Sequence, residues 1–256
     1  MQSPADSNHV PAYDLSIIVP CFNEGGHISQ LMDQLVKAAR SRGIKAEIIF
    51  VDDYSTDKTY EEGLAHSKKH PEIKMLTKKF PRGMGHAIRF GLDHATSDIG
   101  MVVMGDGSDD LRILGDLYNK VGNEGYDLAI GSRYRMKENL VNVPFLYKFF
   151  SRIYCYTCHL LLGIYIKDFT NGYRAFNWKK LKTIGLEGKA FEISPEITFK
   201  CWQFKKSIVE VDSKHQKRLS GSSKFSFLKT AFPYGKMMLK AFFARVTGHW
   251  IRIAPS

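Results

Sequence analysis

An alternation of short β-rich runs with segments of helical periodicity fills the first half of the chain and constrains its fold more than any other feature. Between residues 26 and 42, apolar residues recur at the three- and four-residue spacing of an amphipathic helix. Runs of buried-strand type occur at Leu15–Pro20, Ala46–Val51, Ile73–Thr77, Ile99–Met104 and Tyr126–Arg133. Strands that alternate with helices indicate right-handed βαβ units. We therefore predict an α/β fold with a mostly parallel sheet flanked by helices.

Polar residues follow these strands in the segments "PCFNE", "DDYSTD", "GDGSDD" and "GSRYR". Ligands of open α/β sheets bind outside the carboxyl ends of the strands, so these residues are expected to converge on a ligand. The segment Met104–Asp110, "MGDGSDD", combines a carboxylate with glycines that permit close backbone approach. This pattern suits a divalent cation, Mg²⁺ or Mn²⁺, bound together with a diphosphate. The alternative is an ordinary Gly/Asp turn that caps a helix.

Charge is distributed unevenly along the chain. Residues 1–132 carry 14 Lys+Arg and 19 Asp+Glu, whereas residues 133–256 carry 23 and 7. The second half is therefore expected to face an anionic partner such as a phosphorylated substrate or an anionic membrane. No nucleic-acid partner is expected, because the basic residues are dispersed through apolar helices without a recognised binding motif. The first strand ends in "PCFNEGG" and not in G-x-G-x-x-G, which argues against a nicotinamide-dependent oxidoreductase.

We expect three parts: a flexible tail at 1–13 without a signal-peptide pattern, a catalytic domain at 14–224 and an amphipathic segment at 225–256. The longest uncharged run, Ile153–Ile166, has 14 residues, fewer than the roughly 20 that span a bilayer. Basic residues interleave the apolar tail and predict an interfacial helix on a membrane surface: Lys229, Lys236, Lys240 and Arg245. Cys155 and Cys158 lack a second pair for zinc and are interpreted as buried helix residues.

Seven motifs occur in a characteristic order: "SIIVPCFNE", "IIFVDDYSTD", "RGMGHAIRFGL", "MVVMGDGSDD", "AIGSRY", "KDFTNGYRAF" and "KRLSGSSKF". Together they resemble family 2 glycosyltransferases of the GT-A fold, over about Leu15 to Phe225. Within that family they are most similar to polyprenyl-phosphate sugar synthases of the dolichyl-phosphate mannose synthase type. The motif departs from many of these enzymes at Met104, where they carry a further acid.

The resemblance implies a role for each matching residue. The donor is expected to contact Pro20, Phe22, Glu24, Phe50, Asp52, Asp53 and Gly105. Asp106 is expected to hold the metal and the diphosphate, with Ser108 completing the metal shell. Positive charge around the donor and acceptor phosphates is expected from Arg133, Arg152, Arg218 and Lys224. Asp168 and Arg174 are expected to point into the cleft as catalytic residues. Asp168 alternatively caps a turn and pairs with Arg174.

The implied reaction is inverting transfer of a sugar from a UDP- or GDP-sugar to a polyprenyl phosphate. A lipid phosphate is already anionic, so catalysis needs mainly positioning and stabilisation of the departing diphosphate. The alternative acceptor is a hydroxyl of a polysaccharide or lipid-linked glycan, which requires a carboxylate base, for which Asp168 is the candidate. The resemblance also implies cell-envelope glycan synthesis and a cytoplasmic, peripheral place on the inner face of the membrane. It leaves room for a separate membrane subunit.

Overall fold

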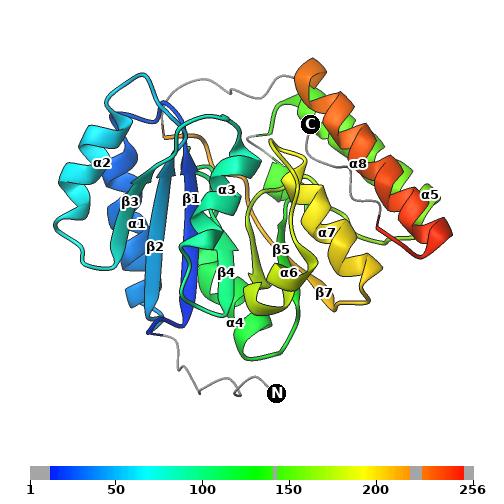
Figure 1. The fold of residues 1–256 in the computed structure, drawn as a ribbon, viewed down its shortest axis with the longest axis horizontal. Coiled ribbons are helices and arrows are strands. Elements are labelled where there is room, and N and C mark those ends of the chain that lie inside the picture. The colour runs from blue at the N-terminus through cyan, green and yellow to red at the C-terminus, as the bar shows by residue number, and fades with distance from the viewer. Residues whose placement is uncertain (1–11, 141–142, 220–226, 251–256) are drawn as a thin grey trace, which may run out of the picture.

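One seven-stranded sheet forms the centre of the computed structural model, which describes residues 12–140, 143–219 and 227–250 (Figure 1). The strands lie in the order β3-β2-β1-β4-β6-β5-β7. Only β6 runs antiparallel to its neighbours, and every other pair is parallel. Their bounds are β1 Leu15–Cys21, β2 Ala46–Asp52, β3 Ile73–Thr77, β4 Ile99–Val102, β5 Leu128–Ser132, β6 Arg174–Asn177 and β7 Ile208–Asp212. This arrangement confirms the predicted mostly parallel α/β sheet.

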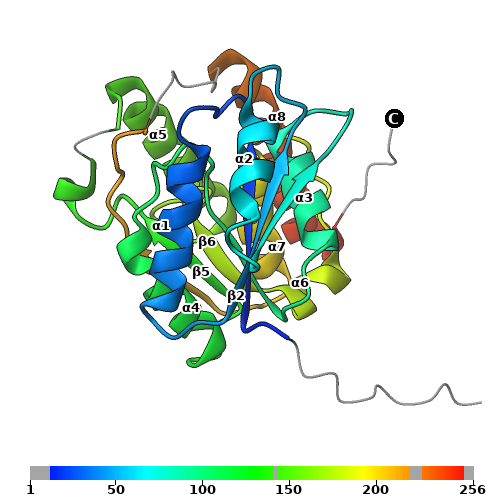
Figure 2. The ribbon, with the colours of Figure 1, turned by 90° about the vertical axis from the view of Figure 1, so that its left-hand side faces the viewer.

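Helices cover both faces of the sheet, as Figure 2 shows for the side of α1 and α4. The α-helices are α1 Ile28–Arg40, α2 Thr59–Ser67, α3 Met84–Asp93, α4 Leu114–Gly122, α5 Phe145–Leu162, α6 Trp178–Ile184, α7 Ile193–Gln203 and α8 Phe227–Thr247. Two short 3₁₀ turns are η1 Leu111–Ile113 and η2 Lys137–Leu140. Ile17 and Val19 of β1 belong to the core beneath α1 and α4, and Ile18 belongs to the core on the opposite face. β1 is buried on both faces, which explains its uninterrupted apolar sequence.

The strands and helices expected in the first half are all present, with small shifts at their ends. The fourth strand ends at Val102, two residues before the predicted end, so Met104 belongs to the loop that follows. The sequence patterns missed β6, α6 and α7. β6 has only four residues, "RAFN", which is too short for a period of two to be recognised.

α5 and α8 pack against each other at the edge of the molecule opposite α2 (Figure 1). The ring of Tyr154 lies 5.1 Å from that of Tyr234, and Arg245 Nη1 donates to the Leu161 carbonyl at 2.8 Å. Cys155 and Cys158 are buried on α5, as expected. No helix in the part of the chain that the structure describes is long and apolar enough to cross a membrane.

The strand order reverses at β1, which lies between β2 and β4. β1 pairs with β2 on one side and with β4 on the other. Open α/β sheets bind ligands at such a switch point, outside the carboxyl ends of the strands. The loops after β1, β2 and β4 therefore meet where a ligand is expected.

Candidate active site

The loop after β4 carries the candidate metal residue Asp106. Its carboxylate is almost fully buried, and Oδ1 accepts a hydrogen bond from the Ser108 backbone N–H at 3.0 Å. Arg218 Nη2 lies 2.5 Å from Asp106 Oδ2, so a guanidinium from the chain segment after β7 pairs with this carboxylate. Gln216 N donates to the Ser108 carbonyl and Leu219 N to the Asp106 carbonyl, at 2.8 and 3.2 Å. The segment after β7 thus lies over the acidic loop.

The two other acids of this loop have structural partners. Asp109 Oδ2 accepts from the Met104 N–H at 2.7 Å, and burial raises the pKa of the Asp109 carboxyl to about 7. Asp110 caps η1 and forms hydrogen bonds at 2.8 Å with Arg112 Nε and Nη2. Burial opposes ionisation of Asp110, but the bonds from Arg112 outweigh it and lower its pKa. Asp106 is therefore the acid of this loop best placed to bind an added cation.

Two glycines let the acidic loop adopt its shape. Gly105 lies against the first loop, and a Cβ there would meet the Pro20 carbonyl oxygen at 2.6 Å. Gly107 has φ +70, a left-handed conformation that favours glycine, and a Cβ would meet Leu219 at 2.6 Å. Pro20 and Gly105 are thus brought together, as expected for residues of one site. Met104 lies close to Gly172, so its side chain points to the 168–173 loop.

The first two loops of the sheet are joined by side-chain bonds to backbone N–H groups. Asn23 N donates to Ser55 Oγ at 2.9 Å, and Glu24 N donates to Thr59 Oγ1 at 2.7 Å. His27 Nε2 lies 3.3 Å from both Glu24 Oε2 and the Gly105 carbonyl, which connects the first loop to the acidic loop. The loops that end β1, β2 and β4 therefore form one connected edge.

Asp52 and Asp53 end β2 at this edge. Asp52 is buried and accepts hydrogen bonds at 3.3 Å from Ser55 N and Thr77 Oγ1. Asp53 Oδ1 lies 3.0 Å from Lys78 Nζ, and Asp53 Oδ2 accepts from Gly83 N at 2.6 Å. Asp53 therefore fixes the loop before α3, and its contact with the donor stays a prediction.

An arginine surrounded by three aromatic rings borders the same edge. The Arg82 guanidinium lies 5.1 Å from the ring centroids of Phe22 and Tyr54 and 5.4 Å from that of Phe80. Tyr54 and Phe80 are exposed, and their centroids are 5.0 Å apart. Flat rings and a guanidinium offer stacking surfaces to a base. The sequence interpretation named only Phe22 of this group: Tyr54 and Arg82 lie within quoted motifs but had no role assigned, and Phe80 lies outside the motifs.

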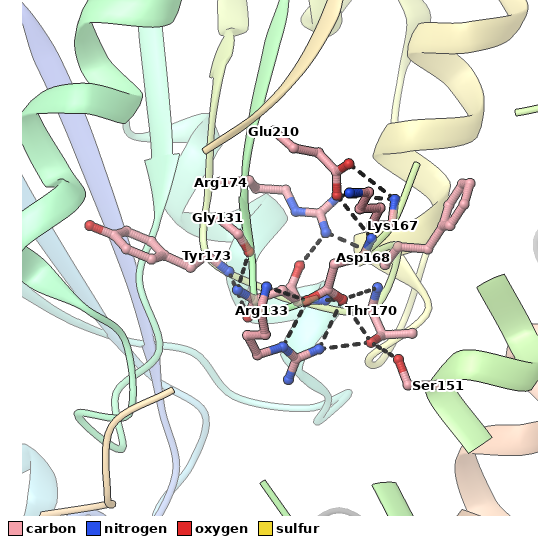
Figure 3. A network of polar contacts seen from close by, with 11 residues as sticks. Gly131, Arg133, Ser151, Lys167, Asp168, Thr170, Tyr173, Arg174 and Glu210 are labelled. Carbon is pink, nitrogen blue, oxygen red and sulfur yellow. Dashed lines mark hydrogen bonds and ion pairs between the residues drawn. The ribbon is translucent and has the colours of Figure 1, made fainter. Parts of the chain in front are cut away.

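Arg133 and Asp168 form a forked ion pair behind the site (Figure 3). Arg133 Nε donates to Oδ2 at 2.8 Å and Nη2 to Oδ1 at 2.9 Å. Asp168 is fully buried and also accepts from the backbone N–H groups of Thr170 and Asn171. Burial opposes ionisation of Asp168, but Arg133 outweighs it and lowers the pKa of this carboxyl. Because its oxygens are saturated and its pKa is low, the structure does not support a base role for Asp168.

Arg174 does not point into the cleft as expected. It is buried, and its guanidinium donates to the carbonyls of Phe169, Asn171 and Ser194 and to Thr198 Oγ1 (Figure 3). Burial lowers the pKa of Arg174 to about 10, so it remains charged at neutral pH. A cation with carbonyl partners fixes the 168–173 loop from below. Asp168 caps the turn at 168–171, but its cationic partner is Arg133 and not Arg174.

Phe50 is also placed differently from the expectation. It lies within β2, is fully buried and belongs to the core beneath α1. Phe50 and Asp52 are two positions apart on β2, so their side chains leave the strand on the same face. Phe50 lies deeper in the core. We therefore assign Phe50 to the core that supports the donor loops.

Arg133 and Arg152 approach one aromatic ring from different elements. Their guanidinium carbons lie 5.7 and 5.4 Å from the ring centroid of Tyr134. Ser151 Oγ lies 2.8 Å from Thr170 Oγ1, which also accepts from Arg133 Nη2 at 2.9 Å. Two guanidinium groups and a hydroxyl therefore gather beside the middle of α5, a donor set that suits a phosphate.

His215 is a residue of this region that the sequence interpretation did not select. Burial lowers the pKa of its imidazole to about 4, with Arg133 and Arg218 adding to the effect. It is therefore neutral at physiological pH and suited to hydrogen bonding without charge. Nothing in its surrounding sequence, "SKHQK", distinguishes it from a surface histidine. Lys224, the remaining predicted phosphate ligand, lies outside the described residues.

The residues of the acidic loop fit Mg²⁺ or Mn²⁺ bound with a diphosphate. Mg²⁺ commonly takes one or two carboxylates and completes its octahedron with water and substrate phosphates. Asp106 supplies one such carboxylate, and Ser108 adjoins it. Among the described residues, the only cluster of three possible ligands lies elsewhere, so the acidic loop does not form an all-protein cage. The pairing of Asp106 with Arg218 shows that this carboxylate attracts a cation.

Comparison with known proteins shows the family of this chain. The family model for glycosyl transferase family 2 matches residues 16–185. The chain belongs to glycosyltransferase family 2. This glycosyltransferase is 30% identical over 222 residues to dolichol-phosphate mannosyltransferase of Pyrococcus furiosus, covering 86% of this chain and 61% of that protein. It is 29% identical over 216 residues to undecaprenyl-phosphate mannosyltransferase of Micrococcus luteus, covering 82% and 86%.

A third relative is dolichyl-phosphate β-glucosyltransferase of Trichomonas vaginalis, 31% identical over 180 residues. The alignment covers 66% of this glycosyltransferase and 55% of that protein. This chain therefore spans less than two thirds of the length of the Pyrococcus and Trichomonas relatives. The resemblance to polyprenyl-phosphate sugar synthases is confirmed at the level of the family and its named homologues.

Among solved structures, glucosyl-3-phosphoglycerate synthase of Mycobacterium tuberculosis has a TM-score of 0.64 at 15% identity, covering 91% of this chain and 78% of that one. That crystal structure contains Mn²⁺, UDP and phosphoglyceric acid. Another structure of the same enzyme, with a TM-score of 0.61 and 15% identity, contains Mg²⁺ and UDP and covers 95% and 82%. At this identity the likeness establishes the fold, and it confirms the GT-A type.

Proposed function

We propose that this glycosyltransferase transfers a sugar from a UDP- or GDP-sugar to the phosphate of a polyprenyl phosphate, with inversion at the anomeric carbon. The observation that carries the proposal is the position of Arg152 on α5. It faces Tyr134 beside Arg133, and its neighbours on the same helix surface are exposed apolar residues. A cationic site next to an apolar stripe suits an acceptor with a phosphate head and a hydrocarbon tail. The named homologues act in the same sense on dolichyl and undecaprenyl phosphates.

The apolar stripe follows helical spacing along α5. Its exposed members are Phe145, Phe149, Ile153, Tyr156 and Leu160. Residues three and four apart lie on one face of a helix, so Arg152 lies between Phe149 and Tyr156. A lipid phosphate held at the arginines would therefore have its chain along this stripe.

The donor is proposed to bind at the edge formed by the loops after β1, β2 and β4. Arg82 and the aromatic rings around it offer a stacking surface for the base. Asp52 lies at the same edge and would contact the ribose or the base. Asp106, with Ser108, would hold Mg²⁺ or Mn²⁺, and a divalent cation there supplies charge stabilisation for the departing diphosphate. The phosphate acceptor needs no proton removed from it, so the chain's task is to hold both substrates in line.

Transfer to a glycan hydroxyl is less well supported. A hydroxyl acceptor requires a general base, and the predicted candidate, Asp168, is saturated by Arg133, Thr170 and Asn171. The arginine pair around Tyr134 would also have no anionic partner in that reaction.

We further propose that the enzyme is peripheral on the inner, cytoplasmic face of a membrane, with or without a separate membrane subunit. The support is the exposed apolar face of α5 and α8, which on α8 includes Phe232, Leu239, Phe243 and Val246. The basic residues of α8 contribute less than the sequence suggests. Lys240 pairs with Glu187 at 2.8 Å, and Arg245 donates to the Leu161 carbonyl. Attachment should therefore depend on apolar burial more than on charge, and flotation with liposomes should persist at high salt.

The test is an acceptor comparison in the wild type and two variants. With polyprenyl phosphate as acceptor, Arg152→Ala should raise the acceptor KM roughly tenfold, the loss of one charge-assisted contact, and leave the donor KM unchanged. Lys179→Ala, an exposed cation on α6 and not on α5, is the control and should change neither KM. A neutral polyprenol or a glycan that is used as well as the phosphate would refute the proposal.

A further inference from the structure

Helix α2 faces α1 with a stripe of polar side chains. Glu62, His66 and His70 follow at intervals of four residues, and the turn after α2 continues this spacing with a bond from His70 N to the Ser67 carbonyl. Glu62 Oε2 accepts from Gly26 N at 2.7 Å. The Nε2 atoms of His66 and His70 lie 2.8 and 2.9 Å from one oxygen, Oδ1, of Asp33 on α1. An imidazole of α2 and one from the turn after it therefore converge on a carboxylate of α1.

This stripe is a large part of what attaches α2 to the domain. Thr59 and Gly63 are the only buried residues of α2. Gly63 lies against Met75 and Met32, where a Cβ would meet the Met75 sulfur at 2.9 Å. Because so little apolar surface of α2 is buried, its position depends on polar contacts with α1.

The ligand atoms of Asp33, His66 and His70 all lie within 4.8 Å of one another. Two imidazole nitrogens and a carboxylate oxygen are a ligand set preferred by Zn²⁺ and related transition metals. The four-residue spacing of His66 and His70 is also the spacing of helical metal-binding histidine pairs. Metal bonds of about 2.0–2.1 Å place ligand atoms about 3.3 Å apart in a tetrahedron, so each distance from Asp33 to an imidazole nitrogen has to open by about half an ångström. The two imidazole nitrogens lie within 4.8 Å of each other and have to settle at the same spacing.

The surroundings permit such an opening. Asp33 is exposed and both histidines are partly exposed, which provides an entry path and an open position for water. Hydrogen bonds from His66 and then His70 lower the pKa of the Asp33 carboxyl, so it stays anionic at neutral pH. Lys69 Nζ lies 3.5 Å from His66 Nδ1. When Nε2 binds a metal, its proton moves to Nδ1 and the exposed Lys69 side chain turns away into solvent.

We propose that Asp33, His66 and His70 form a binding site for a Zn²⁺-class transition metal, separate from the acidic loop, that clamps α2 onto α1. Three protein ligands and one water complete a four-coordinate site. Glu62 belongs to the same stripe and binds Gly26 in the loop before α1. The clamp therefore stabilises the two helices whose preceding loops form the edge near Asp52.

The experiment uses the full chain, free of any affinity tag and stripped with chelator. Zn²⁺ affinity is measured by competition with a chromophoric chelator, and Co²⁺ is added as a spectroscopic substitute. We expect one tight Zn²⁺ per chain, the intense visible absorption of four-coordinate Co²⁺, and a rise in melting temperature that Mg²⁺ does not reproduce. None of these three readouts depends on transfer activity, so the result is independent of the function proposed above.

Single variants identify the ligands. Asp33→Asn, His66→Ala and His70→Ala should each weaken Zn²⁺ binding at least about tenfold, because even changes behind a ligand cost 10- to 100-fold. His94→Ala, at an exposed histidine directly after α3 and outside the cluster, is the control and should bind as the wild type does. The three ligand positions are at least partly exposed, and circular dichroism verifies their folding. Wild-type affinity in the His66→Ala/His70→Ala double variant, or an unchanged hexaaqua Co²⁺ spectrum, would overturn the proposal.

Discussion

Replacing Asp168 with asparagine should destabilise the fold strongly and, in any enzyme that remains folded, raise the acceptor KM more than it lowers kcat, because Arg133 loses the partner that fixes it. Oδ2 of Asp168 accepts from Arg133 N and Nε, and Oδ1 accepts from Arg133 Nη2, Thr170 and Asn171. Whichever way the new amide turns, its NH₂ group meets at least two donors. The substitution also leaves the Arg133 guanidinium, which is largely buried, without its counter-charge.

Breaking one partner of a buried ion pair costs about 3–5 kcal/mol. For a chain of this size, each kcal/mol lowers the melting temperature by roughly 2–4 °C, so Asp168→Asn should melt about 6–20 °C below the wild type. The pKa of Asp168 is lowered in the fold, so its stabilisation is present above the unfolded value of about 3.9 and is lost as pH falls through the folded value. The difference between variant and wild type should therefore stay constant from pH 5 to 8.

Thermal and urea denaturation followed by circular dichroism provide the assay. Asp212→Asn is the matched control, because Asp212 pairs with Arg135 at 2.8 Å near the surface, and it should cost at most about 1 kcal/mol. If Asp168→Asn does not fold, Arg133→Met is compared with the double variant, and the double variant should be the more stable of the two because it buries no unpaired charge. A stable Asp168→Asn enzyme with greatly reduced kcat would refute this reasoning and restore Asp168 as a base.

The other expected outcomes concern substitutions of Gly85, Asp52 and Arg218. Gly85→Ala should destabilise by about 1–3 kcal/mol in denaturant unfolding, because its Cβ would lie 2.4 Å from the Gly188 carbonyl, whereas Gly235→Ala in α8 meets nothing within 4 Å and should be neutral or stabilising. Asp52→Ala should weaken UDP or GDP binding in calorimetry more than it lowers kcat, and unchanged affinity for both would remove Asp52 from the donor site. Arg218→Ala should tighten Mn²⁺ binding, because Arg218 no longer competes for Asp106; equal or weaker binding would contradict that competition.

The strands and the loops after them could be predicted because burial on both faces leaves an apolar run that ends abruptly in polar residues. β1 and the acidic loop are examples, and their place in the sheet follows from the βαβ order. The same pattern selects Asp52 and Asp106, because each follows a central strand, and their roles stay predictions. The family motifs then supplied the roles that spacing alone does not indicate.

Side-chain direction could not be predicted in the second half. Asp168 and Arg174 occur in one motif, "DFTNGYRAF", and their charges suggest either a cleft or a mutual pair. In the structure Arg174 belongs to β6, an antiparallel strand that no pattern indicated, and its side chain lies beneath the 168–173 loop. The true partner of Asp168 is 35 residues earlier in the chain, and only the pairing of β5 with β6 brings the two together.

The charge asymmetry between the two halves gains a physical meaning from these pairings. Arg218 of the basic half neutralises Asp106 of the acidic half, so part of the basic excess is used within the fold, whereas Arg133 and Asp168 neutralise each other inside the basic half. A phosphate that binds at Tyr134 therefore meets two different cations. Arg133 is fixed by its fork and loses little side-chain entropy on binding, whereas the exposed Arg152 has to be ordered. In the proposed reaction, Arg133 would thus set the position of the anion, and Arg152 would supply the net charge that selects an anionic acceptor over a neutral one.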